Sequence, residues 1–338
     1  MNSNKKLVII SNEKVLTNRE KIYCDNIDMK SIPEGLSKNY EVLMISRKSN
    51  TKKFHQINIE KIKLANNIFA YLLSILKTFK YKEANYLIVS ITPYTFFSYI
   101  LLFLFRKEIF VYLRSNGYEE YKAILGFVGS FIFHIMYTFV TFKSHVITCQ
   151  KRLVKKKNYN LVFPSEIDIN WLQNTTKSPL DKPRLLYAGR IKVEKGIFSL
   201  LKVFDEINID AELSIVGNTE DLETSNKKIN FFGFENDISA LIKIYDNHNI
   251  TILPSFTEAH PKVVDESLAR FRPVIIFEEI DHIIQNRRGV FVSKRNAKSL
   301  SETIKFIMSN YSNIRKDMEK NKLPTKQEFI LQMAQIFS

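Results

Sequence analysis

The stretch Leu186-Tyr-Ala-Gly-Arg-Ile-Lys-Val-Glu-Lys-Gly196 combines a short apolar strand, a glycine turn and two cations ahead of a predicted helix. Gly189 permits a tight turn and a close backbone approach, because glycine has no Cβ. Arg190 and Lys195 would project toward a common point near the helix N-terminus. Backbone N–H groups together with Arg and Lys at such a point form a natural diphosphate site. The alternative is a plain strand–loop–helix unit whose two cations are solvated.

A second stretch, Ile252-Leu-Pro-Ser-Phe-Thr-Glu-Ala-His-Pro-Lys-Val-Val-Asp-Glu266, places two carboxylates around the start of another helix. Glu258 is predicted in the loop after a strand, and Glu266 in the first turns of the helix that follows. One carboxylate can then accept hydrogen bonds from sugar hydroxyls while the other accepts them from a ribose. Amides of the intervening loop can meet phosphate at the helix N-terminus. The alternative is a pair of surface glutamates that cap the helix.

Outward from these stretches, short apolar strands alternate with helices, which indicates parallel α/β sheets. Strands are expected at residues 7–11, 40–46, 86–91, 109–114, 145–148, 184–188, 212–216, 229–232, 250–253 and 274–277. Helices are expected at residues 31–38, 60–79, 95–105, 297–310 and 326–337. Ligands of such sheets bind at the carboxyl ends of the strands. The pattern predicts an α/β fold of two Rossmann-like domains facing a central cleft.

The predicted domains are residues 1–168, a linker at 169–183, and residues 184–323. The linker contains Pro179 and several small polar residues, which are typical of interdomain segments. A final helix, residues 324–338, is expected to pack back on the N-terminal domain.

The pairing of Gly-Arg-x4-Lys-Gly with Pro-Ser-x3-Glu-x7-Glu, followed by Pro273-Val274, resembles the family-4 retaining glycosyltransferases, over residues 184–277. The resemblance implies the GT-B fold, with an N-terminal acceptor-binding domain and a C-terminal nucleotide-sugar-binding domain. It also implies a hexosyltransferase-like enzyme that retains the anomeric configuration and needs neither a metal nor a cofactor. Its catalytic residues would be Arg190, Lys195 and Glu258: the two cations would hold the donor diphosphate, and Glu258 would contact sugar hydroxyls.

The resemblance also assigns donor-binding positions, with Glu266 on the nucleotide ribose. These positions are Gly189, Gly217, Gly233, Ala259, His260, Pro261 and Glu266. Two departures from the family's pattern stand nearby. Thr219 replaces the second glycine of a Gly-x-Gly turn, and Phe271 replaces a glycine between the helix and Pro273. Since glycine tolerates positive φ at a helix end, the turn at Phe271 is expected to be built differently.

The N-terminal half matches the family less closely. Ser11-Asn12-Glu13-Lys14 stands where the family has a pair of glycines after the first strand. Arg114 and Asn116 lie at the end of a predicted strand, so they are candidates to contact the acceptor or the donor sugar in the cleft. A plain turn at this place is the alternative.

Charge is unevenly distributed along the chain, whose net charge is +15. Residues 1–168 hold 26 Lys and Arg against 13 Asp and Glu, a balance of +13, while the second half has +2. This asymmetry predicts an anionic partner for the N-terminal half. The apolar stretches 95–105 and 123–142 and the basic cluster 151–157 favour an anionic membrane surface over nucleic acid. Residues 123–142 are long enough to cross a bilayer, but a buried or membrane-lying helix fits better between two strands of one sheet.

The expected function is sugar transfer from a nucleotide-diphosphate sugar to a hydroxyl acceptor, a glycan or a lipid-linked molecule, in cell-surface glycan synthesis. The chain contains no Asp-x-Asp, which agrees with metal-free chemistry. Two distant cysteines and an apolar run of only four residues near the N-terminus predict a cytoplasmic protein, peripheral on the inner face of the cell membrane. The alternatives are a GT-B-fold phosphorylase, a sugar-nucleotide epimerase, or a basic nucleic-acid-binding protein.

Overall fold

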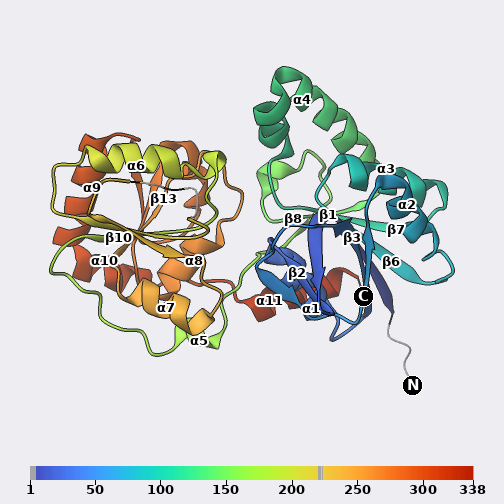
Figure 1. Ribbon diagram of the computed structural model, residues 1–338, viewed down its shortest axis with the longest axis horizontal. Coiled ribbons are helices and arrows are strands. Elements are labelled where there is room, and N and C mark those ends of the chain that lie inside the picture. The colour runs from blue at the N-terminus through green and yellow to red at the C-terminus, as the bar shows by residue number, and fades with distance from the viewer. Residues whose placement is uncertain (1–4, 220–221, 223, 338) are drawn as a thin grey trace. The chain divides into compact units, whose positions relative to one another are not determined.

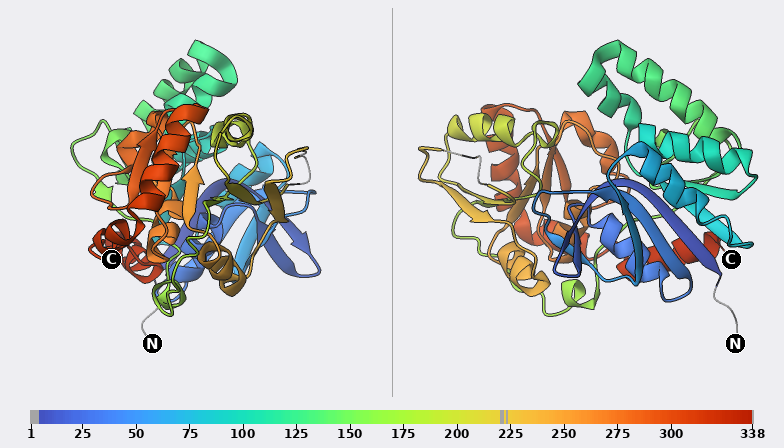
Figure 2. Two further views of the ribbon diagram at one scale, coloured as in Figure 1. Left: turned by 90° about the vertical axis from the view of Figure 1, so that its left-hand side faces the viewer. Right: turned by 45° about the vertical axis from the view of Figure 1, so that its right-hand side comes forward.

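The computed structural model describes residues 5–219, 222 and 224–337, and the chain divides into two compact units. Unit 1 consists of Met1–Phe163 with Gln327–Ser338, and unit 2 of Pro164–Lys326. Each unit is built around a largely or wholly parallel sheet with helices on its faces (Figure 1, Figure 2). The prediction of two Rossmann-like domains is therefore confirmed.

Unit 1 contains nine strands of one sheet. They are β1 (Lys6–Asn18), β2 (Lys21–Cys24), β3 (Glu41–Lys48), β4 (His55–Ile57), β5 (Lys61–Ala65), β6 (Ala84–Val89), β7 (Glu108–Leu113), β8 (His145–Thr148) and β9 (Asn160–Leu161). Its helices are α1 (Asp28–Leu36), α2 (Ile68–Leu76), α3 (Pro93–Leu104), α4 (Gly117–Phe142), the 3-10 helix η1 (Lys151–Leu153) and α11 (Lys326–Ile336).

Strand β1 lies in the centre of unit 1, between β3 and β6, and pairs with both in parallel. The parallel sheet continues through β7, β8 and β9 on one side and β5 on the other. Beyond the expected strand 7–11, β1 runs on to Asn18 and turns back through Arg19 and Glu20 into the antiparallel strand β2. Both turn residues have positive φ, 45° and 66°, which suits the tight turn of a two-residue hairpin.

The helix expected at 60–79 is wrong in its first part. Residues Lys61–Ala65 form strand β5 on the edge of β3, and only Ile68–Leu76 is helical. Asn67 begins α2, because its side chain accepts a hydrogen bond from the Ala70 amide at 2.9 Å. The edge of β3 supplies backbone partners for 61–65 that lie far away in sequence. The short strands β2, β4 and β9 were missed for the same reason.

The two faces of the unit 1 sheet carry separate cores. Helices α1 and α11 cover one face, and α2, α3 and α4 cover the other. Helix α11 inserts Phe329 and Met333 beside Leu7 and Leu87 of the sheet, and Phe337, directly after the helix, joins the same core. The Tyr40 hydroxyl donates to the Ala334 carbonyl at 2.9 Å. The C-terminal helix thus belongs to the core of unit 1.

Unit 2 contains six parallel strands, β10 (Arg184–Ala188), β11 (Glu212–Val216), β12 (Ile229–Gly233), β13 (Ile250–Leu253), β14 (Val274–Phe277) and β15 (Val290–Ser293). Its helices are α5 (Ile169–Leu172), α6 (Ile197–Asp205), α7 (Ile238–Asp246), α8 (Lys262–Ala269), α9 (Ala297–Ser309) and α10 (Tyr311–Met318), with 3-10 helices η2 (Val193–Lys195) and η3 (Glu278–Ile283). Four of the five strands expected here have the observed bounds, the fifth extends by one residue, and β15 was missed.

The turn after α8 corrects the expectation for Phe271. Phe271 adopts the left-handed conformation, with φ of 53°, that a glycine would adopt there. The Arg272 amide donates to the Ser267 carbonyl at 2.9 Å, and the Arg315 guanidinium lies 4.9 Å from the Phe271 ring centroid. The buried Arg272 side chain donates to the carbonyls of His248 and Asp246. These contacts hold a non-glycine residue in a conformation that costs about 1 kcal/mol.

Helix α4 is long and apolar enough to cross a membrane by length and composition, the one such helix among the described residues. Its backbone is interrupted at Gly126, where φ is 62° and ψ is −148°. In Figure 1 it rises away from the sheet of unit 1 and bends back toward α3.

Candidate functional site

The strand order of unit 2 reverses at one point, where ligands of such sheets bind. The order β12-β11-β10-β13-β14-β15 reverses direction in sequence between β10 and β13. Loops that follow two such strands diverge to opposite sides, so the sheet leaves room for a ligand beyond their carboxyl ends. The loop after β10 carries Arg190 and Lys195, and the loop after β13 carries Glu258. The two stretches singled out in the sequence therefore meet at this point.

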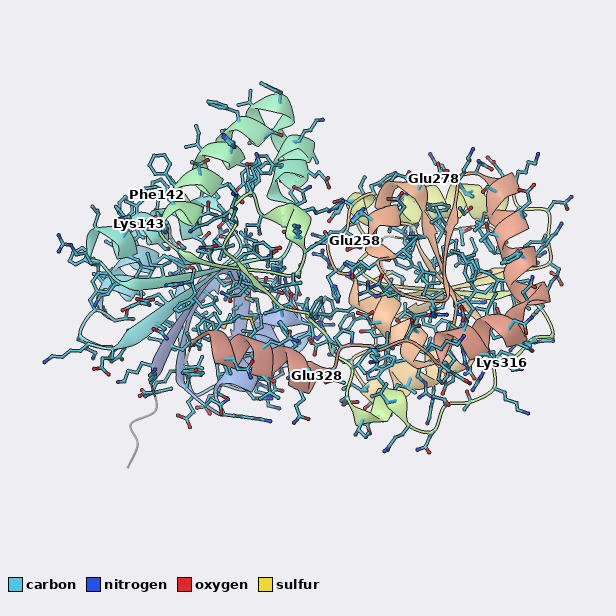
Figure 3. The ribbon with its side chains drawn as sticks, turned by 180° about the vertical axis from the view of Figure 1, so that it is seen from behind. Phe142, Lys143, Glu258, Glu278, Lys316 and Glu328 are labelled. Carbon is cyan, nitrogen blue, oxygen red and sulfur yellow. The ribbon has the colours of Figure 1, made fainter. Side chains whose placement is uncertain are left out.

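An ion pair joins these two loops. The Lys195 ammonium donates to Glu258 Oε1 at 2.5 Å, and the Ser255 hydroxyl donates to the same oxygen at 2.7 Å. Both charged side chains are mostly buried, with exposed fractions of 20% and 10%. His282, on η3, donates from Nε2 to the Glu258 carbonyl at 2.9 Å. The site thus holds one cation and one carboxylate in fixed positions (Figure 3 labels Glu258).

The backbones of the two loops touch at Gly196, which has φ of 69°. A Cβ on Gly196 would overlap the carbonyl oxygen of Pro254. That oxygen accepts a hydrogen bond from Arg295 Nη1 at 2.9 Å, and the Phe256 amide donates to the Glu194 carbonyl at 3.0 Å. Glycine is required at 196 both for its conformation and for this close approach.

Gly189, Gly217 and Gly233 line up at the carboxyl ends of three neighbouring strands. The Gly189 amide donates to the Val216 carbonyl at 2.9 Å, and the Gly217 amide donates to the Gly233 carbonyl at 2.8 Å. A Cβ on Gly217 would overlap the Gly189 carbonyl oxygen. Gly233 has φ of 71° and open space around it. The structure thus brings these three predicted positions together.

Arg190 is exposed at the mouth of the same loop. Its carbonyl accepts a hydrogen bond from the Tyr187 hydroxyl at 2.7 Å, which fixes the backbone of the turn. Burial raises the pKa of Tyr187, so this hydroxyl stays protonated and continues to donate. The side chain of Arg190 remains accessible to an anionic ligand.

The His260 side chain is buried, whereas a side chain that contacts a ligand must be exposed to it. Its ring is 2% exposed and lies 3.1 Å from Asp265 Oδ2. Arg287 donates to the other Asp265 oxygen at 2.6 Å. Burial would raise the pKa of Asp265, but the hydrogen bonds from His260 and Arg287 hold it below its ordinary value. The His260 side chain therefore braces the loop through Asp265 and is not exposed to a ligand.

Ala259 and Pro261 flank His260 at the start of α8. Ala259 is buried, and Pro261 is the residue before the first turn of the helix. Lys262 opens the helix and pairs with Glu166 at 2.7 Å. At the positive, N-terminal end of α8 the loop therefore presents its backbone. The side chains of Ala259 and Pro261 carry no polar group for a ligand there.

Glu266 lies one turn into α8, where its Oε2 accepts a hydrogen bond from the Tyr245 hydroxyl at 2.9 Å. Burial is the main cause that raises the pKa of Glu266 from 4.5 to about 7. The carboxyl is thus poised to be neutral or ionised near physiological pH. Either form can accept a hydrogen bond from a ribose hydroxyl.

The raised pKa of Glu266 predicts a pH-dependent stability. Above pH 4.5 the unfolded chain loses this proton while the native state keeps it up to about pH 7, so the native state binds more protons. The free energy of unfolding should therefore fall across this range as pH rises. Glu266→Gln removes the titration, so the variant should match wild type near about pH 5 and exceed it by roughly 1–3 kcal/mol near about pH 8.

Urea denaturation at several pH values, followed by the fluorescence of Trp171, checks this expectation. Trp171 is the only tryptophan of the chain and is buried in unit 2. The exposed Glu302→Gln on α9 is the matched control and should follow wild type. A Glu266→Gln curve that runs parallel to wild type at every pH would contradict the assignment.

Arg114 and Asn116 lie in unit 1, just beyond β7. Arg114 Nη1 donates to Asp28 Oδ2 at 2.8 Å, and both side chains are partly buried. Asn116 precedes α4, and its side chain makes no capping hydrogen bond there. Arg114 therefore has a structural partner, and the Asn116 side chain has no capping role at the start of α4.

Sequence reasoning missed the residues that support this site. Ser255 and His282 hold Glu258, while Asp265 and Arg287 hold the His260 loop. Ser255 was quoted in the Pro-Ser pattern without a role, and a polar side chain three residues before Glu258 was the signal. His282 and Arg287 come from segments after β14, so only the tertiary structure reveals them. Within the described residues no group of three or more His, Cys, Asp or Glu could hold a metal ion.

Comparison with solved structures supports the same architecture across the whole chain. Sucrose-phosphate synthase from Thermosynechococcus elongatus superposes with a TM-score of 0.70 over 98% of both chains, at 17% identity. Anabaena Alr3699/HepE, in complex with UDP and glucose, gives 0.69 over 98% of this chain and 99% of that one, at 12% identity. WaaG, a glycosyltransferase involved in lipopolysaccharide biosynthesis, gives 0.68 with the same coverage and identity. The fold is that of the GT-B proteins.

Sequence comparison gives a family match for the second half of the chain. Residues 169–324, in the C-terminal half of the chain, match the family of glycosyl transferases group 1. The uncharacterized glycosyltransferase MJ1607 of Methanocaldococcus jannaschii is 28% identical over 177 residues, 45% of this chain and 44% of that protein. The capsular polysaccharide biosynthesis glycosyltransferase CapM of Staphylococcus aureus is 27% identical over 139 residues, 37% of each chain. The matched part spans less than half the length of these relatives.

Proposed function

We propose that the chain is a retaining, metal-independent glycosyltransferase. It transfers a sugar from a nucleotide-diphosphate sugar to a hydroxyl group of a lipid-linked acceptor or a growing polysaccharide. The observation that carries the proposal is the Lys195–Glu258 pair at the strand-order reversal of unit 2, with Arg190 exposed in the same loop. A cation pair for a diphosphate and a carboxylate for sugar hydroxyls are the groups that such a donor requires.

The cations act on the leaving group. When the bond between the anomeric carbon and the phosphate oxygen breaks, its electron pair and negative charge pass to the diphosphate. Arg190 and Lys195 supply the compensating charge, together with amides of the loop at 259–260. Preorganised charge at this point is usually the largest catalytic term. Two protein cations are enough for this task without a metal ion.

The carboxylates position the donor. Glu258, fixed by Lys195 and Ser255, accepts hydrogen bonds from sugar hydroxyls, and Glu266 accepts from the ribose. The acceptor hydroxyl attacks on the face that the diphosphate leaves, and its proton passes to a donor phosphate oxygen. The anomeric configuration is thereby retained. Asn116 and Arg114 are the candidates for contacts to the acceptor.

The proposed setting is the cytoplasmic face of the cell membrane, in cell-surface glycan synthesis. Two of the similar proteins carry such roles in their names: CapM in capsular polysaccharide biosynthesis, and TuaC of Bacillus subtilis, putatively in teichuronic acid biosynthesis. The balance of +13 in residues 1–168 fits an acceptor embedded in an anionic surface.

The experiment that tests this function has two stages. Thermal shift against a panel of UDP- and GDP-sugars first identifies the donor, because a ligand of the native state raises its stability. The second stage uses lipid-linked acceptors, with and without excess EDTA. It measures the release of nucleoside diphosphate, and NMR gives the anomeric configuration of the product. We expect transfer with retention at an unchanged rate in EDTA. Loss of activity in EDTA that Mg²⁺ or Mn²⁺ restores would contradict the metal-free mechanism.

The same assay separates the competing functions. A phosphorylase would release sugar 1-phosphate from a glycan, and an epimerase would interconvert nucleotide sugars without an acceptor. Either product in place of acceptor glycosylation would replace the proposal.

A further inference from the structure

Helix α4 is a folded hairpin and not a straight rod. At Gly126 the backbone takes φ of 62° and ψ of −148°, a conformation open only to glycine. A Cβ on Gly129 would overlap the Tyr121 carbonyl oxygen, and one on Gly117 would overlap the Phe133 ring. Residues 117–125 and 127–142 therefore pack against each other. The longer arm spans about 24 Å at roughly 1.5 Å per residue, less than the ~30 Å of a bilayer core.

The bend of this hairpin is an exposed apolar tip, residues 123–128. Every residue of the tip is exposed, with Ile124 at 75% and Phe127 at 85%. A helix that packs on the core of a water-soluble protein would turn such apolar side chains inward. The tip instead lies at the bend of the hairpin, in the part of the chain that rises from unit 1 in Figure 1.

The neighbouring helices also expose apolar side chains. Helix α3 packs against both α2 and α4, and all three expose large apolar side chains. In α3 the pattern is inverted, because Thr95 and Ser98 are buried while Phe97 and Leu104 are exposed. The outer apolar face consists of Phe69, Leu73 and Leu76 on α2, Phe97, Phe103 and Leu104 on α3, and Ile132, Ile135, Phe139 and Phe142 on α4.

A row of cations borders this face. Strands β6, β7 and β8 are parallel, and each begins shortly after α2, α3 or α4 ends, so the three helices end along one edge of the sheet. The exposed residues Lys77, Arg106 and Lys143, here called the basic row, lie at these ends. Each of the three comes directly after an exposed apolar residue in the sequence. Figure 3 labels one such pair, Phe142 and Lys143.

Further basic residues adjoin the hairpin. The Lys156 ammonium donates to the Thr141 carbonyl of α4 at 3.1 Å, and the Lys155 ammonium lies 4.7 Å from the Tyr118 ring centroid. Lys143, Lys156 and Lys157 line one open cavity at the end of α4. From residue 123 to residue 142 the chain has no charged side chain at all.

We propose that unit 1 docks on an anionic phospholipid leaflet by inserting the apolar tip and the outer apolar face, while the basic row lies among the headgroup phosphates. The hairpin enters and leaves the same side, so the protein is attached to one leaflet and does not span it. Charge complementarity selects a lipid surface over a second copy of the chain, because the same cations would repel across a symmetric interface. The proposal does not depend on the donor chemistry.

Co-sedimentation of the full chain with vesicles tests the docking. Vesicles of phosphatidylcholine alone are compared with vesicles that also contain phosphatidylglycerol, and we expect binding only to the second, weakened as salt rises. Ile124→Ser with Phe127→Ser should weaken binding at least about tenfold, because two exposed apolar side chains lose their lipid contacts. Phe306→Ser with Leu331→Ser, equally apolar exposed positions on α9 and α11, should leave it unchanged.

A second pair of variants isolates the charge. Replacing the basic row by Gln should weaken binding to anionic vesicles by more than about tenfold. Replacing Lys294, Lys298 and Lys305, three exposed cations of unit 2, changes the net charge equally and should have little effect. Circular dichroism melts verify that each variant is folded. If both triple variants lost vesicle binding equally, the attraction would depend on net charge alone. The role proposed for the basic row would then be wrong.

Depth distinguishes insertion from surface adhesion. In Phe127→Trp, lipids brominated on the acyl chain should quench the new tryptophan, whereas Leu331→Trp and the buried Trp171 should stay unquenched. An unquenched Phe127→Trp in bound protein would overturn the insertion. A dimer found by analytical ultracentrifugation without lipid would also overturn the insertion if the Ile124→Ser, Phe127→Ser variant dissociated it. The tip would then be a protein interface.

Discussion

Replacing Lys195 by alanine is expected to lower kcat by at least about a hundredfold, because the leaving diphosphate loses a cation held within the site. The structure adds a reason to the expected loss. Lys195 also neutralises Glu258, to which it donates at 2.5 Å. Without it, a mostly buried carboxylate would face the incoming diphosphate and repel it. Arg190→Ala should lower kcat to a similar degree through the loss of charge alone.

Steady-state kinetics with the donor found by thermal shift measure both effects. Lys192→Ala is the matched control, since Lys192 is an exposed cation of the same loop and should keep the wild-type kcat. Folding is checked through Trp171 fluorescence. If a folded Lys195→Ala or Arg190→Ala variant turned over at nearly the wild-type rate, the diphosphate assignment would be wrong.

Gly196→Ala is expected to be the most disruptive single methyl group in unit 2. The residue has φ of 69°, and its Cβ would overlap the Pro254 carbonyl oxygen. Left-handed backbone costs alanine about 1 kcal/mol, and separating two packed backbones adds about 1–3 kcal/mol. We expect the free energy of unfolding to fall by roughly 3 kcal/mol and donor affinity to fall with it, because the loops after β10 and β13 move apart.

Gly233→Ala separates the two causes. Gly233 has nearly the same φ, 71°, but nothing lies within 4 Å of its Cβ position. Its alanine variant should therefore lose only about 1 kcal/mol. Urea denaturation followed at Trp171, which lies in unit 2, measures both variants. If the free energy of unfolding fell equally in the two variants, the close contact between Gly196 and Pro254 would add nothing to the cost of the methyl group.

Much of unit 2 was predictable because its information is local. Strands such as β14 (Val274–Phe277), and β10 from Leu185 on, are continuous apolar runs, as expected for strands covered on both faces. The glycines, cations and glutamates follow these strands directly, so their place at the carboxyl edge was implied by the parallel arrangement. In unit 1 the edge strand β5 was mistaken for helix, because its partner β3 was needed to define it.

By itself, the sequence determined two α/β domains and the loops that carry Arg190, Lys195 and Glu258, since strand periods and turn residues act over a few neighbouring positions. Only the tertiary structure decided which of these side chains are paired and which stay exposed. It joined Lys195 to Glu258 across 63 residues, turned the His260 ring inward onto Asp265, and folded α4 back on itself at Gly126. Such outcomes depend on long-range packing and on the space around each side chain, which no local pattern contains.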